Sequence, residues 1–360
     1  MSRCWLITDT HLGIKNSSNE WIEIHREFFY DWFFPLVRKN YKEGDILIHL
    51  GDLFDSRQSL NLKVLNMVIE IFEELSSIFP AGVHVICGNH DIYTKSTNDV
   101  NSLKSLKWIP NIKIHESPFS LSHGGKNLLL VPWVENKDEE SEFLSKQNKS
   151  DYVFCHTDFS GMKFNKWTKI EKGIDPEKVK KIKKIYSGHI HYSQKKGNIH
   201  LLGCPYQLNR SDADNPKGIF LLDLASGEET FFENEMSPKF IRAKYKWISE
   251  RTDEEISQLI SNNFVDILIE SDDDPKDFID SKTDIISRSR RFMVQPLFTT
   301  DEGLLVEGFD FDESRDFSLK DLLGKYVGSL SYDEKMKDRL RLGLEKIYEI
   351  ATGEGGSSED

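Results

Sequence analysis

Five short clusters in this sequence carry side chains that can bind metal ions or transfer protons. In chain order they are Asp9-Thr10-His11, Gly51-Asp52-Leu53-Phe54-Asp55, Gly88-Asn89-His90-Asp91, Cys155-His156 and Gly188-His189-Ile190-His191. Aspartate, asparagine and imidazole form a mixed oxygen and nitrogen ligand set, which suits manganese, iron or zinc in a paired site better than calcium. Two cations about 3.5–4 Å apart can activate a water, orient a phosphate and neutralise the developing charge. The clusters therefore predict a two-metal site for phosphodiester hydrolysis.

The clusters differ in how strongly each one alone indicates a metal. An Asp-Thr-His sequence after a strand is more often a capped turn, and a lone histidine such as His156 is more often only hydrogen-bonded. In Gly88-Asn89-His90-Asp91, a tight turn explains the glycine and the asparagine but not the His-Asp pair. The two histidines of the fifth cluster would lie on one face of an extended segment. One carboxylate must bridge the metals, and Asp52 is the natural candidate because the glycine before it allows a tight turn.

Each cluster follows a short apolar run that is typical of a buried strand. The runs are Trp5–Ile7, Ile46–Ile48, Val83–Ile86, Leu128–Val131, Tyr152–Phe154 and Ile185–Tyr186. Residues near 21–39 and 61–77 have the pattern of amphipathic helices. This alternation up to about residue 235 predicts a layered α/β fold. In such folds, sites form outside the carboxyl ends of the strands, so we expect the five clusters to converge there.

A second region begins near Ser237-Pro238 and contains strand-like and helical stretches in turn. Strands are expected at 240–245, 264–269 and 292–294, and a helix begins after Thr252, which can cap it. The predicted domains are a core over 1–236, a small α+β cap over 237–312, two helices within 313–352 and a solvated tail over 353–360. Both C-terminal helices begin with the Ser-x-x-acid pattern of a capping box.

Composition limits the classes of protein that this chain can be. At 360 residues, 38% hydrophobic and 30% charged, it should fold as a large domain with a smaller appendage. It contains no apolar stretch of about 18 residues, so we expect no membrane span. The four cysteines lie far apart, which fits a reducing cytosol better than a zinc ribbon. A net charge of −13 argues against broad adhesion to nucleic acid, so any DNA contact should be local.

Together and in this order, the five clusters resemble the signature of calcineurin-like metallophosphoesterases. Within that superfamily the chain is similar to the SbcD-type nucleases of DNA double-strand-break repair, with a particular likeness to phage recombination endonuclease subunits. Beyond the clusters, this likeness lies in Asp9–Lys15 with Asn19-Glu20-Trp21, and in Leu202–Gln207 with Asp214–Gly218. It covers the first 235 residues well and the rest only by layout. The resemblance implies a four-layer αββα core.

The resemblance also divides the candidate ligands between two metals, which the residue types alone do not. It implies one metal on Asp9, His11, Asp52 and His191, and the other on Asp52, Asn89, His156 and His189, with Asp52 as the bridge. His90 corresponds to the catalytic histidine, which faces the scissile phosphate without binding a metal, and Asp91 would orient it. The implied cofactors are two divalent cations, Mn²⁺ first and Mg²⁺ as the alternative.

The function implied is that of a metal-dependent DNA exonuclease or endonuclease subunit of an SbcCD-like recombination and repair complex. Its partners would be duplex DNA ends, single strands, an SMC-like SbcC-type ATPase and a second copy of the chain, in the cytoplasm of the cell or of an infected host. The alternative is a protein phosphatase or a small-molecule phosphodiesterase, since a fold does not choose a substrate. A third interpretation is an idle scaffold that only recruits a partner, but the complete ligand set argues against it.

Several basic residues are candidates for DNA contact. Asp55-Ser56-Arg57 resembles a segment of protein phosphatases in which the arginine holds the substrate phosphate, but Arg57 could instead form a surface salt bridge. In the cap, Arg288, Arg290 and Arg291 form a basic cluster that either meets DNA or ends a solvated helix.

An apolar stripe is expected on the last helix. Its residues are Met336, Leu340, Leu344, Ile347 and Ala351. Spacings of three and four place them on one helix face. This face either packs on the protein's own core or, as the resemblance implies, docks on the ATPase.

Overall fold

The structure, a computed structural model, describes residues 2–94, 97–297 and 337–340. The chain divides into two compact units, Met1–Glu307 and Gly308–Asp360. Apart from a helical turn at 337–340, the expected C-terminal helices and tail lie outside the described residues. Among the described helices, none is long and apolar enough to cross a membrane.

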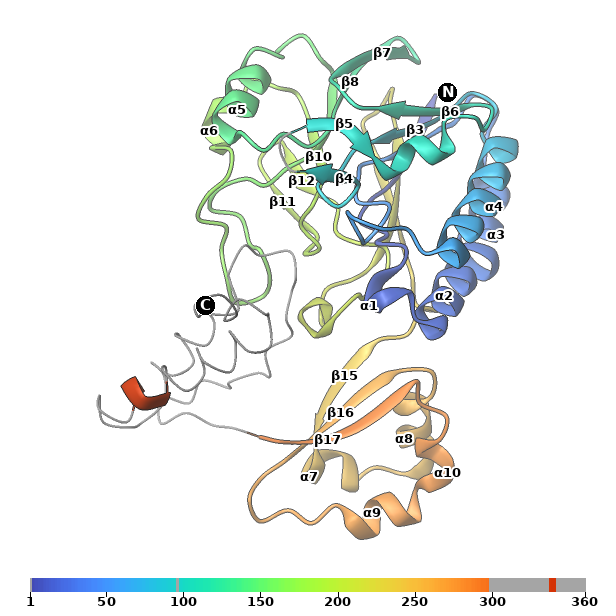
Figure 1. The fold of residues 1–360 in the computed structure, drawn as a ribbon, viewed down its shortest axis with the longest axis vertical. Coiled ribbons are helices and arrows are strands. Elements are labelled where there is room, and N and C mark those ends of the chain that lie inside the picture. Colours follow the sequence, from blue (N-terminus) through green and yellow to red (C-terminus); the bar gives the residue numbers. More distant parts are fainter. Residues whose placement is uncertain (1, 95–96, 298–336, 341–360) are drawn as a thin grey trace, which may run out of the picture. The chain divides into compact units, whose positions relative to one another are not determined.

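Two six-stranded sheets form the core of the first unit (Figure 1). The first sheet has the order β14-β13-β1-β2-β3-β6, with β1 Arg3–Ile7, β2 Ile46–His49, β3 Val83–Ile86, β6 Ile112–His115, β13 Gly218–Asp223 and β14 Glu229–Glu233. The second has the order β11-β12-β10-β9-β8-β7, with β7 Phe119–His123, β8 Lys126–Val131, β9 Tyr152–His156, β10 Ile185–Gly188, β11 Gln194–Lys196 and β12 Ile199–Leu201. The central strands of each sheet run parallel, so their carboxyl ends share one edge.

Helices cover the outer face of each sheet, which gives the expected αββα layers (Figure 1). The helices against the first sheet are α2 Asn19–Arg26, the π-helix η1 Glu27–Phe33, α3 Phe34–Asn40 and α4 Leu62–Ile78. Those against the second are α5 Lys137–Ser145 and α6 Pro176–Val179. Alternate residues of a strand face opposite sides, so Trp5 packs with the helices of the first sheet, whereas Leu6 belongs to the cluster between the sheets with Phe154.

The expected helix at 21–39 is one continuous helical stretch that widens in its middle. The residues Glu27–Phe33 adopt a π-helix. Pro35 lies at the start of α3 and has no backbone N–H to donate, so the regular hydrogen-bond ladder is interrupted next to it. The wider turn accommodates a buried aromatic cluster that includes Phe28 and Phe33.

Short elements connect the layers. They are α1 Ile14–Ser17, β4 Ile92–Thr94, β5 Thr97–Asn101, the 3-10 helix η2 Ser102–Leu106 and the 3-10 helix η3 Arg210–Asp212. The hairpin of β4 and β5 follows the third cluster directly.

As far as residue 297, where the described part of the cap region ends, it contains three parallel strands and four short helices. The strands are β15 Phe240–Lys244, β16 Phe264–Ile269 and β17 Arg291–Pro296, and the helices are α7 Tyr245–Ser249, α8 Asp253–Ile260, α9 Lys276–Ser281 and α10 Thr283–Ile286. Thr252 caps α8 as expected, in a capping box with Glu255. An ion pair between Arg210 and Asp266 ties the strand β16 to the segment after the second sheet.

Candidate metal centre

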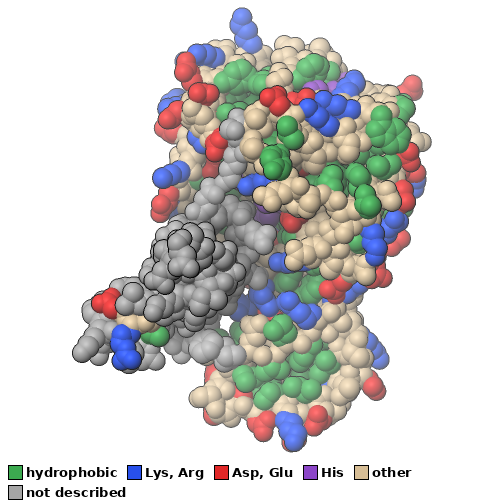
Figure 2. Space-filling model, in the orientation of Figure 1, with side chains coloured by type: hydrophobic (Ala, Val, Ile, Leu, Met, Phe, Trp, Pro, Cys, Tyr) green, Lys and Arg blue, Asp and Glu red, His purple; other side chains and the backbone are tan. Residues whose placement is uncertain are grey.

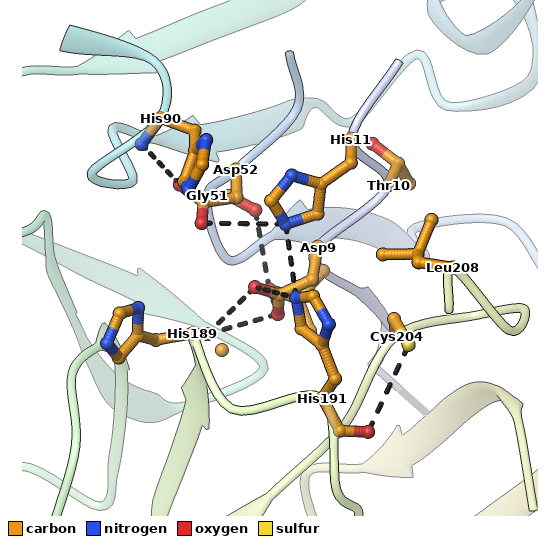
Figure 3. A network of polar contacts seen from close by, with 12 residues as sticks. Asp9, Thr10, His11, Gly51, Asp52, His90, His189, His191, Cys204 and Leu208 are labelled. Atoms are coloured by element: carbon orange, nitrogen blue, oxygen red, sulfur yellow. Dashed lines mark hydrogen bonds and ion pairs between the residues drawn. The ribbon is translucent and has the colours of Figure 1, made fainter. Parts of the chain in front are cut away.

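The five clusters converge at the carboxyl ends of the central strands. Figure 3 shows residues of four of them close together. The first three follow β1, β2 and β3 of the first sheet, the fourth ends β9, and the fifth follows β10 of the second sheet. Because the two sheets face each other, both contribute to one site. This is the arrangement expected when the carboxyl ends of parallel strands meet at a common edge.

Most candidate ligands fall into two groups of three, and His11 and Asp52 also form such a group with His90. Ligand atoms of Asp9, His11 and His191 lie within 4.8 Å of one another, and the same holds for Asp52, His156 and His189. The Oδ1 atom of Asn89 lies 3.1 Å from Nε2 of His156 and so joins the second group. Carboxylate, amide and imidazole donors, mostly buried, fit divalent cations of intermediate softness.

Asp52 lies between the two groups. Its Oδ2 is 3.2 Å from Nε2 of His156 and 3.7 Å from Nε2 of His11. Its Oδ1 accepts a hydrogen bond of 2.8 Å from the backbone N–H of His90. Burial alone would raise the pKa of Asp52, but the charge of His156 and its hydrogen bond to the carboxylate outweigh burial and hold that pKa well below its ordinary value. The carboxylate therefore faces both groups in its charged form.

The rings of the fifth cluster do not share a face, contrary to the expectation for an extended segment. His189 belongs to the group of Asp52 and His191 to that of Asp9, and Figure 3 shows the two rings diverging. The reason is that the backbone of His189 is left-handed, with φ of 80°. This turn sends the two imidazoles to different groups.

Four candidate ligands in all have left-handed backbones, which are uncommon for residues other than glycine. The φ angles are 53° at Asp9, 43° at His11, 52° at Asp52 and 80° at His189. Hydrogen bonds hold these conformations: the N–H of Asp9 donates to Gly51 O at 3.0 Å, and that of His189 donates to the Asp9 carboxylate. At these four residues the strain lies in the turns that aim the ligands.

In three of the clusters a glycine stands directly before a candidate ligand. The loops pack so closely against one another there that a side chain would not fit. A Cβ added at Gly51 would lie 2.6 Å from Nδ1 of His156. One at Gly88 would collide with the backbone nitrogen and the carboxylate of Asp52. Larger residues at these positions would push the ligands apart.

A hydrogen bond to a backbone carbonyl holds the imidazole of His90 in place. Its Nδ1 lies 2.7 Å from the carbonyl oxygen of Asp55. A carbonyl only accepts, so Nδ1 carries the proton and Nε2 is left as the free nitrogen. Burial lowers the pKa of His90, which favours the neutral ring.

Asp91 does not orient His90, and that expectation is corrected. Its carboxylate accepts hydrogen bonds from the N–H groups of Phe54 at 3.0 Å and Gly88 at 2.9 Å. Burial, and then the charge of Asp52, raises the pKa of Asp91 to about 7. The Asp91 carboxylate therefore links the loop of the second cluster to that of the third, and it does not bind the His90 imidazole.

Asp55, whose role the sequence left open, contacts a candidate ligand. Its Oδ1 lies 3.1 Å from Nδ1 of His11, an arrangement in which a carboxylate fixes the orientation of a metal-binding imidazole. Burial alone would lower the pKa of His11, but its hydrogen bond to the Asp55 carboxylate and the charge of Asp52 outweigh burial and raise the pKa to about 9.

His156 is held in a comparable way. Its Nδ1 donates to the carbonyl of Leu50 at 2.6 Å, which turns Nε2 toward Asp52. Burial alone would lower the pKa of His156, but the Asp52 carboxylate outweighs it and raises the pKa to about 9. Both imidazoles would therefore hold a proton until a cation displaces it.

Trp133 and Lys137 lie beside the second group of ligands. Neither residue was predicted from the sequence to be part of the site. The ring of Trp133 lies 4.9 Å from that of His189, and Nζ of Lys137 lies 3.6 Å from the Trp133 ring centroid. The signal in the sequence is the Pro132-Trp133 pair directly after the apolar run of β8. The large ring of Trp133 covers one side of His189.

The candidate DNA-contacting arginines differ in their surroundings. Arg57 donates from Nε to the carbonyl of Asn89 at 2.7 Å, and it has no carboxylate partner among the described residues. Arg290 instead pairs with Glu27 at 2.7 Å and Glu23 at 3.2 Å, so its charge is already neutralised within the protein. A DNA contact by Arg290 would have to compete with these ion pairs, and it stays a prediction.

The other two cap arginines remain exposed. Arg291 lies 5.7 Å from the ring centroid of Phe264, and Arg288 donates to Ser257 at 3.4 Å. On the face drawn in Figure 2, acidic and basic side chains are interspersed over the described surface. That mixture is in keeping with local rather than broad contact with a polyanion.

Comparison with known proteins gives a consistent family match. Residues 2–193 match the family described as calcineurin-like phosphoesterase. The chain is 30% identical to exonuclease subunit 1 of Enterobacteria phage T4 over 232 residues, which is 63% of this chain and 66% of the phage protein. It is 27% identical over 176 residues to a protein of invertebrate iridescent virus 3 provisionally named as a phosphoesterase, covering 45% of this chain and 48% of that one.

The matched regions span less than two thirds of either relative. A solved structure of a protein of unknown function from Aquifex aeolicus is 23% identical, with a TM-score of 0.26, and covers 43% of this chain and 80% of that one.

Proposed function

The chain belongs to the calcineurin-like phosphoesterase family, and from this premise we propose that it is a metal-dependent DNA nuclease acting at the site of the five clusters. The observation that carries the proposal is the pair of ligand groups that face a shared carboxylate, Asp52. Asp9, His11, Asp52 and His191 would hold one divalent cation, and Asp52, Asn89, His156 and His189 the other. Two such cations activate an attacking water, orient the phosphate and neutralise its developing charge.

The chain's own residues supply the remaining steps. His90 presents Nε2 as a proton acceptor while its Nδ1 proton is bound to the Asp55 carbonyl, and once protonated it can pass a proton to the leaving oxygen. Arg57 is fixed by Nε on the Asn89 carbonyl, which leaves its terminal nitrogens for phosphate oxygens. We propose Mn²⁺ as the cation, with Mg²⁺ as the alternative.

DNA is proposed as the substrate over phosphoproteins or small phosphodiesters. The support is the name of the phage relative, an exonuclease subunit, together with a cap region beyond the phosphoesterase core. Exposed Arg288 and Arg291 of this region, with Arg290 between them in sequence, are the proposed DNA contacts. We place the activity in the cytoplasm, that of the host if the chain is viral, and the four free, buried cysteines suit a reducing compartment.

The test compares four substrates with the purified chain. They are end-labelled duplex DNA, single-stranded DNA, a chromogenic phosphodiester and a phosphopeptide, each with Mn²⁺ or Mg²⁺. We expect Mn²⁺-dependent cleavage of DNA, and its loss in Asp52→Asn, which removes the carboxylate facing both groups. Efficient release of phosphate from the peptide without DNA cleavage would instead support the phosphatase alternative.

We further propose an SMC-like ATPase of the SbcC type and a second copy of the chain as protein partners. The support is that the phage relative is named as a subunit, and the proposed docking stripe includes Leu340 and Leu344. Replacing both leucines with Glu should abolish co-purification with the ATPase while leaving Mn²⁺-dependent cleavage of single strands intact. An unfolded variant, or unchanged ATPase binding, would assign the stripe to the protein's own core. Sedimentation of the purified chain tests the dimer.

A further inference from the structure

A buried ion pair lies directly behind His191. Nζ of Lys217 is 2.9 Å from Oδ1 of Asp212, and the two side chains are 4% and 3% exposed. The same ammonium donates to the carbonyl oxygen of His191 at 2.6 Å. A fully buried lysine is uncommon without such compensation. Its position on a candidate ligand's carbonyl therefore needs an explanation.

Asn215 and Gly203 also contact the backbone of residues 191–193. Asn215 accepts from the N–H of Ser193 at 2.9 Å and donates to its carbonyl at 3.3 Å. Gly203, with φ of 76°, packs so closely that a Cβ there would lie 2.8 Å from the carbonyl oxygen of His191. Lys217, Asn215 and Gly203 thus hold residues 191–193 from three sides. All three belong to the stretches 202–207 and 214–218, to which the sequence assigned no role.

This arrangement is not a third metal site. Ligand atoms of His191, Cys204 and Asp212 do lie within 4.8 Å of one another. However, the Lys217 ammonium already provides a positive charge on Asp212, whose Oδ2 also accepts from the N–H of Leu208 at 3.0 Å. Burial raises the pKa of the Cys204 thiol well above its ordinary value, so it remains neutral. In the group of His191, Cys204 and Asp212, the Lys217 ammonium therefore supplies the positive charge that a metal ion would otherwise supply.

His191 is the most exposed of the three residues in the Asp9 group, so its backbone has a large part in placing its ring. Its side chain is 23% exposed, whereas that of Asp9 is 0% and that of His11 is 5% exposed. The ring touches the site through the 3.1 Å contact between its Nε2 and Nε2 of His11. The position of a metal ligand whose side chain is partly exposed depends strongly on the contacts that hold its main chain.

We propose that Lys217, paired with Asp212 and assisted by Asn215, is a positioning residue for His191 that sets the affinity of the Asp9 group for its cation. Lys217 touches neither the cation nor the substrate. This inference rests on the proposed two-cation site. Removal of a group that supports a metal ligand lowers metal affinity by about 10–100-fold.

The test uses the double variant Lys217→Met/Asp212→Asn. Lys217→Met alone would leave a buried, unpaired carboxylate and could fail to fold. In the double variant, the asparagine still accepts from the N–H of Leu208 and no charge is left unpaired. Mn²⁺ stoichiometry and affinity are measured by calorimetry and by metal analysis after dialysis. We expect one cation bound as in the wild type and the other bound about 10–100-fold more weakly, with excess Mn²⁺ restoring DNA cleavage.

A matched control removes a buried ion pair at the opposite end of β1. Arg3 and Asp45 lie 2.6 Å apart, with side chains 10% and 0% exposed. Arg3→Met/Asp45→Asn should lower thermal stability but leave both cations in place with unchanged affinity.

The outcomes separate the two claims. A wild-type chain that does not bind two cations would overturn the proposed site itself. A wild type with two cations and a double variant at Lys217 and Asp212 that binds both equally well would overturn the positioning role alone. Loss of both cations, or the same loss in the Arg3 control, would show a general effect on folding and would also overturn it.

Discussion

The two imidazoles with raised pKa values predict that pH acts in opposite directions on the metal-free and the metal-bound protein. His11 and His156 are buried, and Asp55 and Asp52 raise their pKa from 6.5 to about 9. A folded-state pKa above the unfolded value gives stability that is fully present below pH 6.5 and is lost as the pH rises through 9. One pKa unit corresponds to about 1.4 kcal/mol, so either imidazole contributes about 3 kcal/mol. Because both interact with Asp52, the two contributions are not summed.

Metal binding reverses this dependence. A cation binds the deprotonated imidazole, so its uptake near pH 7 should release up to about two protons per chain and its affinity should rise toward pH 9. Stability in saturating Mn²⁺ should therefore hold or increase over the range in which the chelated protein becomes less stable.

Urea unfolding between pH 6.5 and 9, with either a chelator or Mn²⁺, measures both slopes, and calorimetry in buffers of different ionisation enthalpy counts the protons released. Asp52→Asn is the control: it removes the charge that both imidazoles face, so the slope of the chelated protein should flatten. A chelated wild type that is equally stable at both ends of this range, or metal uptake without proton release, would refute the reasoning.

Three further substitutions test the site. His90→Ala should keep both cations and DNA binding but lower turnover about 10²–10⁴-fold; metal analysis and single-turnover cleavage check this, and a lost cation would make His90 a ligand. Arg57→Ala should raise KM for DNA more than it lowers kcat, since the guanidinium is held beside the site on the Asn89 carbonyl; an unchanged KM would exclude it from phosphate binding. Asp55→Asn should weaken Mn²⁺ binding about 10–100-fold, because His11 loses a charged partner, and an unaltered Mn²⁺ dependence of cleavage would contradict this.

The layers of the fold were predictable because buried parallel strands appear as continuous apolar runs. The strands at the sheet edges were not. β7 and β11 are largely exposed and rich in polar residues, so they lack the apolar run that marks a buried strand. The π-helix at 27–33 was also missed, since a wider turn keeps the same apolar face as an ordinary helix.

The ligand types of the site were predictable, but their division between two groups was not derivable from spacing. It depends on left-handed turns at residues such as His189, whose side-chain type gives no sign of a positive φ. The role of Asp91 was mistaken for a similar reason. A carboxylate next to a histidine in sequence can bond to loop N–H groups, here those of Phe54 and Gly88, which only the folded chain brings to it.

The left-handed ligand turns have a consequence for how this protein changes under selection. A residue other than glycine in such a conformation costs on the order of 1–3 kcal/mol, so glycine at Asp9, His11, Asp52 or His189 would relieve strain. That gain would be offset at His11 and Asp52, because glycine would also remove the buried ion pairs that these side chains form. Selection for folding alone would therefore act weakly on these two positions, whereas selection for metal binding would keep their side chains.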